Sequence, residues 1–228
     1  MEGRDLKRRH RAELWDKWHE TSGPRFPHEK IVQFLYRNYR GRDDASALSA
    51  LDLGCGNGIH TELLVEMGMS VTSVDVSSVA LRSAQRRMAA ADLPQPLFVE
   101  ALLSHLDFPI RSFDVIISAG VLDYAGVAET RATASRLPDW LRPEGKAFLV
   151  FAADGDFRQA TVKNLDLHCY TRIEVDELFP SRKGLEVWVD RYITTYANDT
   201  LQQMDWLLTL HRQTGAEHAK LENSGHMD

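Results

Sequence analysis

Residues 51–58 read Leu51-Asp52-Leu53-Gly54-Cys55-Gly56-Asn57-Gly58. The apolar run 47–53 predicts a buried strand, and the pattern over 59–67 predicts a helix. The turn between them carries little side-chain bulk, and glycine tolerates positive φ, so a ligand can approach the backbone closely. On its glycines alone, such a turn is compatible with NAD, FAD or another nucleotide.

A carboxylate at the end of the next predicted strand, 70–76, narrows the set of cofactors that the turn could bind. Asp75 ends that strand, where a carboxylate can accept hydrogen bonds from both hydroxyls of a ribose. The alternative is a structural role, in which Asp75 stabilises the N-terminus of the helix predicted over 77–91. The two roles are compatible with each other.

Short apolar runs and helical patterns alternate along the rest of the chain. The further expected strands are 97–101, 113–118, 146–151, 185–192 and 206–210, and the further expected helices are 4–20, 27–39, 127–141 and 171–179. Alternation at this spacing predicts right-handed βαβ units and a parallel sheet. The last two strands are expected to close that sheet as a hairpin edge.

The length of 228 residues suits one ample domain. We therefore expect a single domain over 1–213, in which a helical lid over 1–44 precedes a core over 45–213. The stretch 214–228 is polar and without pattern, so it is expected to be a disordered tail.

Composition limits the classes of partner. The formal net charge of −6 argues against a nucleic-acid partner, and the basic runs 7–11 and 82–87 are interpreted as solvated helix faces. Cys55 and Cys169 do not form a disulfide framework, which predicts a reducing compartment. No apolar run approaches the length of a membrane span and the N-terminus is charged, so a cytoplasmic location without membrane association is expected. No spacing indicates a metal site, and no pattern indicates the oligomeric state.

Taken together, these stretches resemble the class I methyltransferases that depend on S-adenosylmethionine (SAM), in particular those acting on small molecules. The matching segments are 51–58, 74–77, 106–109, 112–116, 121–124 and 141–146. They arrive in order over about 48–151, whereas dehydrogenases more typically show G-x-G-x-x-G. The resemblance implies a Rossmann-like, doubly wound α/β fold with a mostly parallel seven-stranded sheet, an antiparallel edge strand and N-terminal lid helices.

The resemblance also implies SAM as the cofactor and assigns residues to it. Gly54 and Gly56 would flank its methionine part, in a loop completed by Cys55 and Gly58, and Asp52 would meet its amino group directly or through water. The other implied contacts are Asp75 with the ribose, Val76 with the adenine, Thr61 near the carboxylate at the helix N-terminus, and the Ala119 carbonyl with the amino group.

One position departs from the family pattern. Leu102 stands where many relatives carry an Asp that accepts from the adenine amine. Adenine recognition is therefore expected from the backbone of Leu103 or Ser104 and from apolar packing.

Methyl transfer is an in-line displacement, so the protein mainly aligns the acceptor and excludes water. Asp123 and Tyr124 follow the fourth expected strand at the ligand-binding edge; the alternative is a capping Asp beside a surface Tyr. His168 is the most natural base because imidazole titrates near neutrality, and its alternative is a structural or exposed histidine. Asp123 and His168 slightly favour an oxygen acceptor over a nitrogen acceptor.

Aromatic residues before and after the core are candidates for acceptor contacts. Trp15, Trp18 and His19 on the first helix are expected to form a lid, with His19 as a second candidate base. Core packing would also explain the tryptophans. Tyr170, beside His168, lies in a loop expected to close over the acceptor.

The leading hypothesis is a SAM-dependent methyltransferase acting on an oxygen, or a nitrogen, of a small molecule. The second is a SAM-binding regulatory protein or partner subunit without transfer activity, and the third is a nucleotide-dependent oxidoreductase. Methylation of a nucleic-acid base amine is disfavoured because Ser118-Ala119-Gly120-Val121 replaces the Pro-Pro-aromatic stretch typical of that chemistry.

Overall fold

The computed structural model describes residues 2–162 and 165–214, with the side chains of the first helix described from residue 10 onward. Of the predicted tail, 214–228, only Thr214 is therefore among the described residues. Within the described ranges, no helix combines the length and the apolar character that crossing a bilayer requires.

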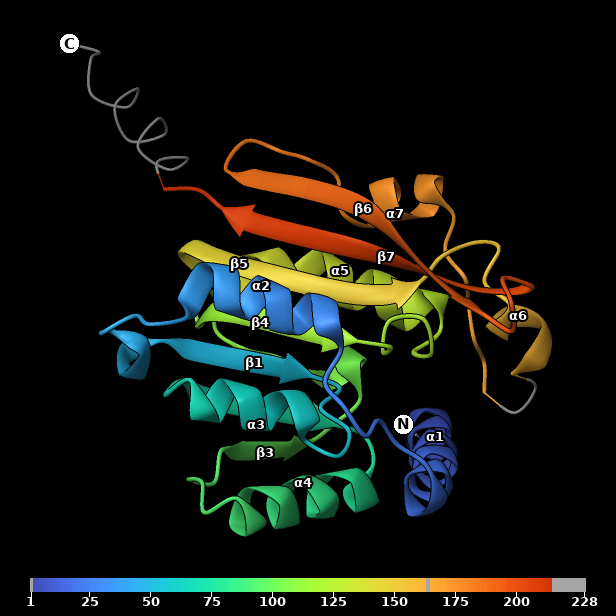
Figure 1. Cartoon of the computed structure of the whole chain (residues 1–228), viewed down its shortest axis with the longest axis horizontal. Coiled ribbons are helices and arrows are strands. Elements are labelled where there is room, and N and C mark those ends of the chain that lie inside the picture. Colours follow the sequence, from blue (N-terminus) through green and yellow to red (C-terminus); the bar gives the residue numbers. More distant parts are fainter. Residues whose placement is uncertain (1, 163–164, 215–228) are drawn as a thin grey trace.

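A seven-stranded sheet with the order β3-β2-β1-β4-β5-β7-β6 forms the centre of the molecule (Figure 1). Its strands are β1 (Ser49–Leu53), β2 (Ser70–Asp75), β3 (Leu97–Glu100), β4 (Phe113–Ala119), β5 (Leu141–Ala152), β6 (Leu185–Tyr196) and β7 (Leu201–Arg212). Strands β1 to β5 pair in parallel, whereas β7 pairs antiparallel with both β5 and β6. The predicted fold class is confirmed, and the antiparallel strand of the closing hairpin is second from the edge.

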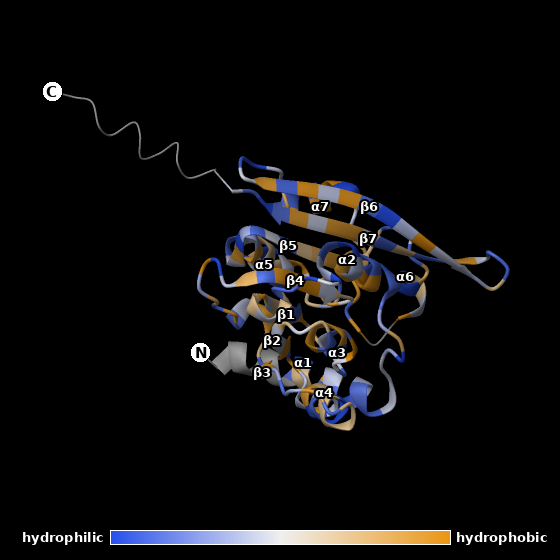
Figure 2. Ribbon diagram, turned by 60° about the vertical axis from the view of Figure 1, so that its left-hand side comes forward, coloured by the Kyte–Doolittle hydropathy of each residue, from blue (hydrophilic) through white to orange (hydrophobic). Residues whose placement is uncertain are grey.

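Helices cover both faces of the sheet, and the first helix lies beyond the ends of its strands (Figure 1). The helices are α1 (Glu2–Thr21), α2 (Glu29–Tyr39), α3 (Ile59–Glu66), α4 (Ser78–Ala90), α5 (Val127–Trp140), α6 (Arg158–Thr161) and α7 (Arg172–Leu178). One apolar core joins α2 and α3 to the sheet, and the other joins α5 and α7 to its opposite face. Figure 2 shows apolar residues concentrated along the central strands between these layers.

Strand β4, at the centre of the sheet, contains a continuous run of apolar residues because it is covered on both faces. Val115 and Ile117 belong to the core under α2, whereas Ile116 belongs to the core under α5. Successive side chains of a strand point to opposite faces, so a strand covered on both faces needs apolar residues at every position.

The structure differs from the sequence prediction mainly in its last third. Strand β5 begins at Leu141 rather than at 146, with an irregularity in its pairing with β4 between Phe113 and Val115. Strands β6 and β7 each span 12 residues, and the short helix α6 has no counterpart in the predicted elements. Strand β7 pairs with β5, which is distant in sequence, and forms a hairpin with β6, the strand just before it.

Candidate functional site

A cleft of about 1390 Å³ lies where β1, β2 and β4 end. Helix α1 crosses beyond these strand ends (Figure 1) and forms the opposite wall. A pocket for one drug-sized ligand typically measures roughly 300–1,000 Å³. The cleft is therefore large enough for two small molecules side by side.

The glycine turn after β1 forms one end of the cleft. Gly54 and Gly56 have positive φ values of 75° and 54°, and a Cβ on Gly54 would lie 2.2 Å from a methyl carbon of Val121. Gly54, Cys55 and Gly56 line the cleft. The backbone therefore forms this wall itself, as the sequence predicted for a ligand-binding turn.

Gly58 lies behind this wall and does not line the cleft. It precedes α3 with φ 78°, and a Cβ there would lie 2.7 Å from the Cβ of Ala84 in α4. Its missing side chain serves the packing of two helices, which corrects the expectation of a direct cofactor contact.

Asp75 is the buried carboxylate of this end of the cleft. Its Oδ2 accepts from the Gly56 N–H at 2.8 Å, and its Oδ1 accepts from the Ser77 N–H at 2.9 Å. Burial raises the pKa of Asp75, while the Ser77 and Gly56 N–H groups and nearby His19 lower it. Each carboxylate oxygen keeps lone-pair capacity for a further donor such as a ribose hydroxyl. Val76 lines the cleft beside it.

Asp52 and Thr61 support the turn from behind. The Thr61 hydroxyl donates to Asp52 Oδ2 at 2.6 Å, and neither residue lines the cleft. Burial raises the pKa of Asp52 to about 7, although the Thr61 hydrogen bond opposes this shift. Both side chains lie behind the lining of the cleft, and the contact of Asp52 with the amino group, directly or through water, and the role of Thr61 at the carboxylate stay predictions.

The side of the cleft next to β3 is apolar. Leu102 and Leu103 line it, as Ala119 does from the end of β4. Ser104 points elsewhere, because its N–H and its hydroxyl both donate to Glu129 Oε1 at 3.1 Å. Of the residues expected near the adenine, Val76 and Leu103 line the cleft and Ser104 does not.

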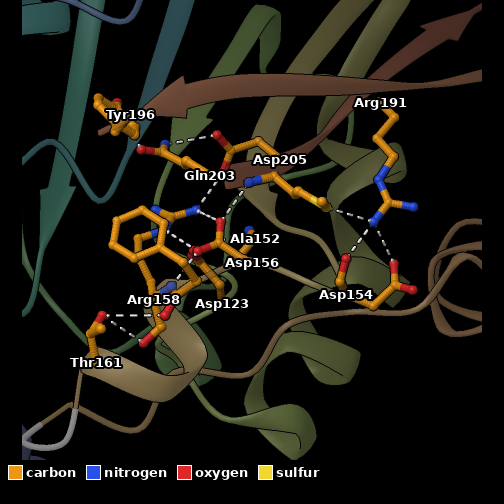
Figure 3. Close-up of polar contacts among 12 residues, drawn as sticks. Asp123, Ala152, Asp154, Asp156, Arg158, Thr161, Arg191, Tyr196, Gln203 and Asp205 are labelled. Atoms are coloured by element: carbon orange, nitrogen blue, oxygen red, sulfur yellow. Dashed lines mark hydrogen bonds and ion pairs between the residues drawn. The ribbon is translucent and has the colours of Figure 1, made fainter. Parts of the chain in front are cut away.

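A polar group at the other end of the cleft was not predicted from the sequence. Arg158 donates from Nη2 to Asp156 Oδ2 at 2.7 Å and to Asp205 Oδ1 at 2.6 Å, and Gln203 Nε2 donates to Asp205 Oδ2 at 2.9 Å (Figure 3). Arg158, Gln203 and Asp205 line the cleft. We call these three residues, with Asp156, the arginine cluster.

Only the sheet topology could have revealed this cluster. Arg158 follows β5, but Gln203 and Asp205 lie near the start of β7. Because β7 runs against β5, its beginning lies at the edge where the parallel strands end. The sequence pattern does not give a strand direction.

His28 is a further cleft residue that the sequence analysis missed. Its Nδ1 accepts from the Lys30 N–H at 3.3 Å, as the cap of α2. Burial is the main cause that lowers the pKa of His28, while Asp205 and Glu29 raise it. The neutral ring therefore carries its proton on Nε2 and acts as a hydrogen-bond donor.

Tyr124 lines the cleft, but its predicted partner Asp123 does not. Asp123 is fully buried; its Oδ2 accepts from the Ala152 N–H at 3.1 Å, and its carbonyl accepts from the His168 N–H at 2.8 Å. Its Oδ1 has no hydrogen-bond partner among the described residues. Burial raises the pKa of Asp123 to about 7, with Arg158 opposing.

His168 and Tyr170 lie outside the cleft, contrary to the expectation for an acceptor-facing loop. His168 Nε2 lies 2.9 Å from Glu174 Oε1, and its ring packs at 4.4 Å on Tyr170. Tyr170 is 1% exposed and donates to the Leu122 carbonyl at 3.2 Å. Both side chains anchor this loop to the core, so neither is kept as a candidate acceptor contact.

The aromatic residues of α1 do face the cleft. Trp15 packs edge-on against Tyr124 at 5.4 Å and against Trp18 at 5.5 Å. His19 lies over Gly56, where a Cβ would meet its ring at 3.3 Å. Burial lowers the pKa of His19, while Asp75 and Asp16 raise it. His19 therefore lies at the glycine-turn end of the cleft rather than beside the arginine cluster.

Sequence comparison relates the central part of this chain to methyltransferases. Residues 50–145 match the family described as "Methyltransferase domain". The mitochondrial ubiquinone biosynthesis O-methyltransferase of Schizosaccharomyces pombe is 29% identical over 146 residues, which are 60% of this chain and 50% of that protein. A malonyl-[acyl-carrier protein] O-methyltransferase of Paenibacillus sp. is 31% identical over 131 residues, or 56% and 45% of the two chains. The chain thus spans about half the length of these curated relatives.

Solved structures share the fold. Magnesium protoporphyrin IX methyltransferase from Synechocystis, with bound S-adenosylhomocysteine (SAH), gives a TM-score of 0.66 at 18% identity and covers 92% of this chain and 100% of that one. A SAM-dependent methyltransferase from Anabaena variabilis gives 0.65 at 15% identity, covering 90% and 95%. At these identities the likeness concerns the fold.

Proposed function

Because residues 50–145 belong to the methyltransferase domain family, whose class I members use SAM as cofactor, we propose that this chain transfers the SAM methyl group to an oxygen of a small molecule. One observation carries the proposal. The glycine turn with Asp75 and the end formed by Tyr124, His28 and the arginine cluster share a single cleft. The names of the O-methyltransferase relatives support oxygen as the atom methylated.

We assign the two ends of the cleft as follows. The cofactor binds over Gly54 to Gly56, with its ribose on Asp75, and supplies an electrophilic sulfonium methyl group. The acceptor binds between Tyr124 and the arginine cluster. A partner of low molecular weight fits this cleft, and neither a nucleic acid nor a membrane is part of the proposal.

The residues at the acceptor end can align an oxygen without acting as strong bases. Burial raises the pKa of Tyr124 to about 12, so its hydroxyl stays protonated and donates a hydrogen bond. The His28 Nε2–H is a second donor, and Asp205 can accept from the acceptor hydroxyl. Alignment and exclusion of water by the tryptophans of α1 then provide the catalysis.

The test is incubation of the protein with methyl-labelled SAM and a fractionated metabolite extract. We expect a labelled product together with SAH, and we expect Tyr124→Phe to lower kcat/KM at least about tenfold, the size of a lost hydrogen bond, without changing SAH affinity. SAH binding without any labelled product from an extract of the source cells would favour a SAM-binding regulatory protein instead.

A further inference from the structure

Helix α1 is fastened on both sides of the cleft. On one side, Asp16 Oδ1 accepts from the Ser77 hydroxyl at 2.5 Å and from the Val79 N–H at 3.1 Å, at the N-terminus of α4. On the other side, Arg11 donates to the Ala125 carbonyl and forms an ion pair with Glu129 of α5. The helix therefore spans the cleft between two attachment points.

The attachment through Asp16 continues directly to the buried carboxylate of the glycine-turn end. Ser77 joins the two carboxylates, because its hydroxyl donates to Asp16 while its N–H donates to Asp75. Asp75 in turn accepts from the Gly56 N–H. One hydrogen-bonded chain thus runs from α1 through the start of α4 to the glycine turn.

His19 places a ring over the same turn. It follows Asp16 by about one helical turn, so both side chains lie on one face of α1. Its Nδ1 is buried and has no hydrogen-bond partner among the described residues, and its ring lies against Gly56. The ring above the turn and the attachment to α4 therefore belong to the same segment of α1.

We propose that Asp16 is a positioning residue of the cofactor site, whose hydrogen bonds to Ser77 and Val79 hold α1 closed over the bound cofactor. The cofactor and its product exchange only when this attachment opens. The inference rests on the proposed function, because it takes SAM and SAH as the ligands. Asp16 acts through α4 and α1 rather than by touching the reacting atoms.

The test is the rate of SAH dissociation, followed by stopped-flow fluorescence of Trp15 and Trp18. We expect Asp16→Ala to raise the dissociation rate at least about tenfold, the size of one charged hydrogen bond, and to raise the KM for SAM without lowering kcat. Asp16→Asn should restore most of the wild-type rate, because an amide oxygen can accept the same two hydrogen bonds. Glu13→Ala, which removes an exposed acid from the same helix, should leave the rate unchanged.

The outcomes separate this inference from the proposed function. An unchanged dissociation rate in a folded Asp16→Ala protein would overturn the role of Asp16 and leave cofactor binding intact. Failure of the unaltered chain to bind SAH would overturn both. If Asp16→Ala does not fold, Arg11→Gln must raise the dissociation rate by releasing the opposite end of α1, and an unchanged rate there would also contradict the closure.

Discussion

At the scale of single residues, Asp75 is where a structural role and a binding role coincide. It already accepts two backbone N–H groups, and it lines the cleft. We expect Asp75→Ala to weaken SAH binding at least about hundredfold, because it removes charged hydrogen bonds worth roughly 1.5–3 kcal/mol each. Isothermal titration calorimetry measures this directly. Glu66→Ala, at an exposed position of α3, serves as the control, and an affinity within twofold of wild type for Asp75→Ala would refute the ribose assignment.

Gly58 permits a second prediction at this scale, about packing rather than binding. Gly58→Ala and Gly41→Ala both place a side chain at positive φ, but only the Cβ at position 58 meets another helix, at 2.7 Å, whereas nothing lies within 4 Å at position 41. Both variants therefore carry backbone strain, but only Gly58→Ala adds a steric overlap with the facing helix α4. We expect Gly58→Ala to lose about 1–3 kcal/mol more unfolding free energy in urea than Gly41→Ala. Equal losses would show that α3 and α4 separate freely.

The sequence predicts those site residues whose position follows from the local pattern of strands and turns. Gly54, Gly56 and Asp75 lie at the ends of strands that the pattern identifies, so their position followed from the chain itself. His168 and Tyr170 were misjudged because the pattern showed a loop but not its packing against the core. His28 looked like an ordinary helix start, and its place in the cleft depends on tertiary structure.

At the scale of elements, α6 is short and depends on the arginine cluster for its position. Arg158→Ala would leave Asp156 and Asp205 buried without their partner, so we expect a loss of roughly 3–5 kcal/mol of unfolding free energy. Arg172→Ala removes an exposed pair with Asp176 within α7 and should change stability by less than about 0.5 kcal/mol. Chemical denaturation of both variants makes the comparison; similar small losses would mean that α6 is held by other contacts.

The prediction of elements succeeded where burial is continuous and failed where it is partial. Strands β1 and β4 are covered on both faces and were identified almost to the residue. The first half of β7, residues 201–205, mixes polar side chains with apolar ones; it pairs with β6, and only Asp205 of this stretch also pairs with β5. A partly exposed strand of this kind is held by its pairing in the hairpin, which leaves little trace in the hydrophobic pattern of its own residues.

At the scale of the whole molecule, buried acids make stability depend on pH. Burial raises the pKa of both Asp52 and Asp123 to about 7 from 3.8. Between these pH values the folded chain keeps protons that the unfolded chain has lost. The contribution of the two acids to the free energy of unfolding is therefore fully present below about pH 4 and is lost as the pH rises through 7.

Asp123→Asn isolates half of this effect, because the amide stays neutral throughout. From pH 4 to pH 8 we expect the wild type to lose on the order of 4 kcal/mol more unfolding free energy than the variant. Urea denaturation at several pH values measures the difference. Parallel pH profiles for the two proteins would contradict a protonated Asp123 in the folded state.

The place of β7 between β5 and β6 also sets the order in which the molecule can assemble. Strand β6 leaves the ribosome first but has no partner until β7 emerges, because its cross-strand pairing is with β7 alone. A nascent chain that has reached only Tyr196 exposes an unpaired edge on β5 and a free strand, both of which can pair with other chains. Strand β7, the last strand of the described residues, thus completes the sheet, and the arginine cluster forms only at that step because Gln203 and Asp205 lie on it.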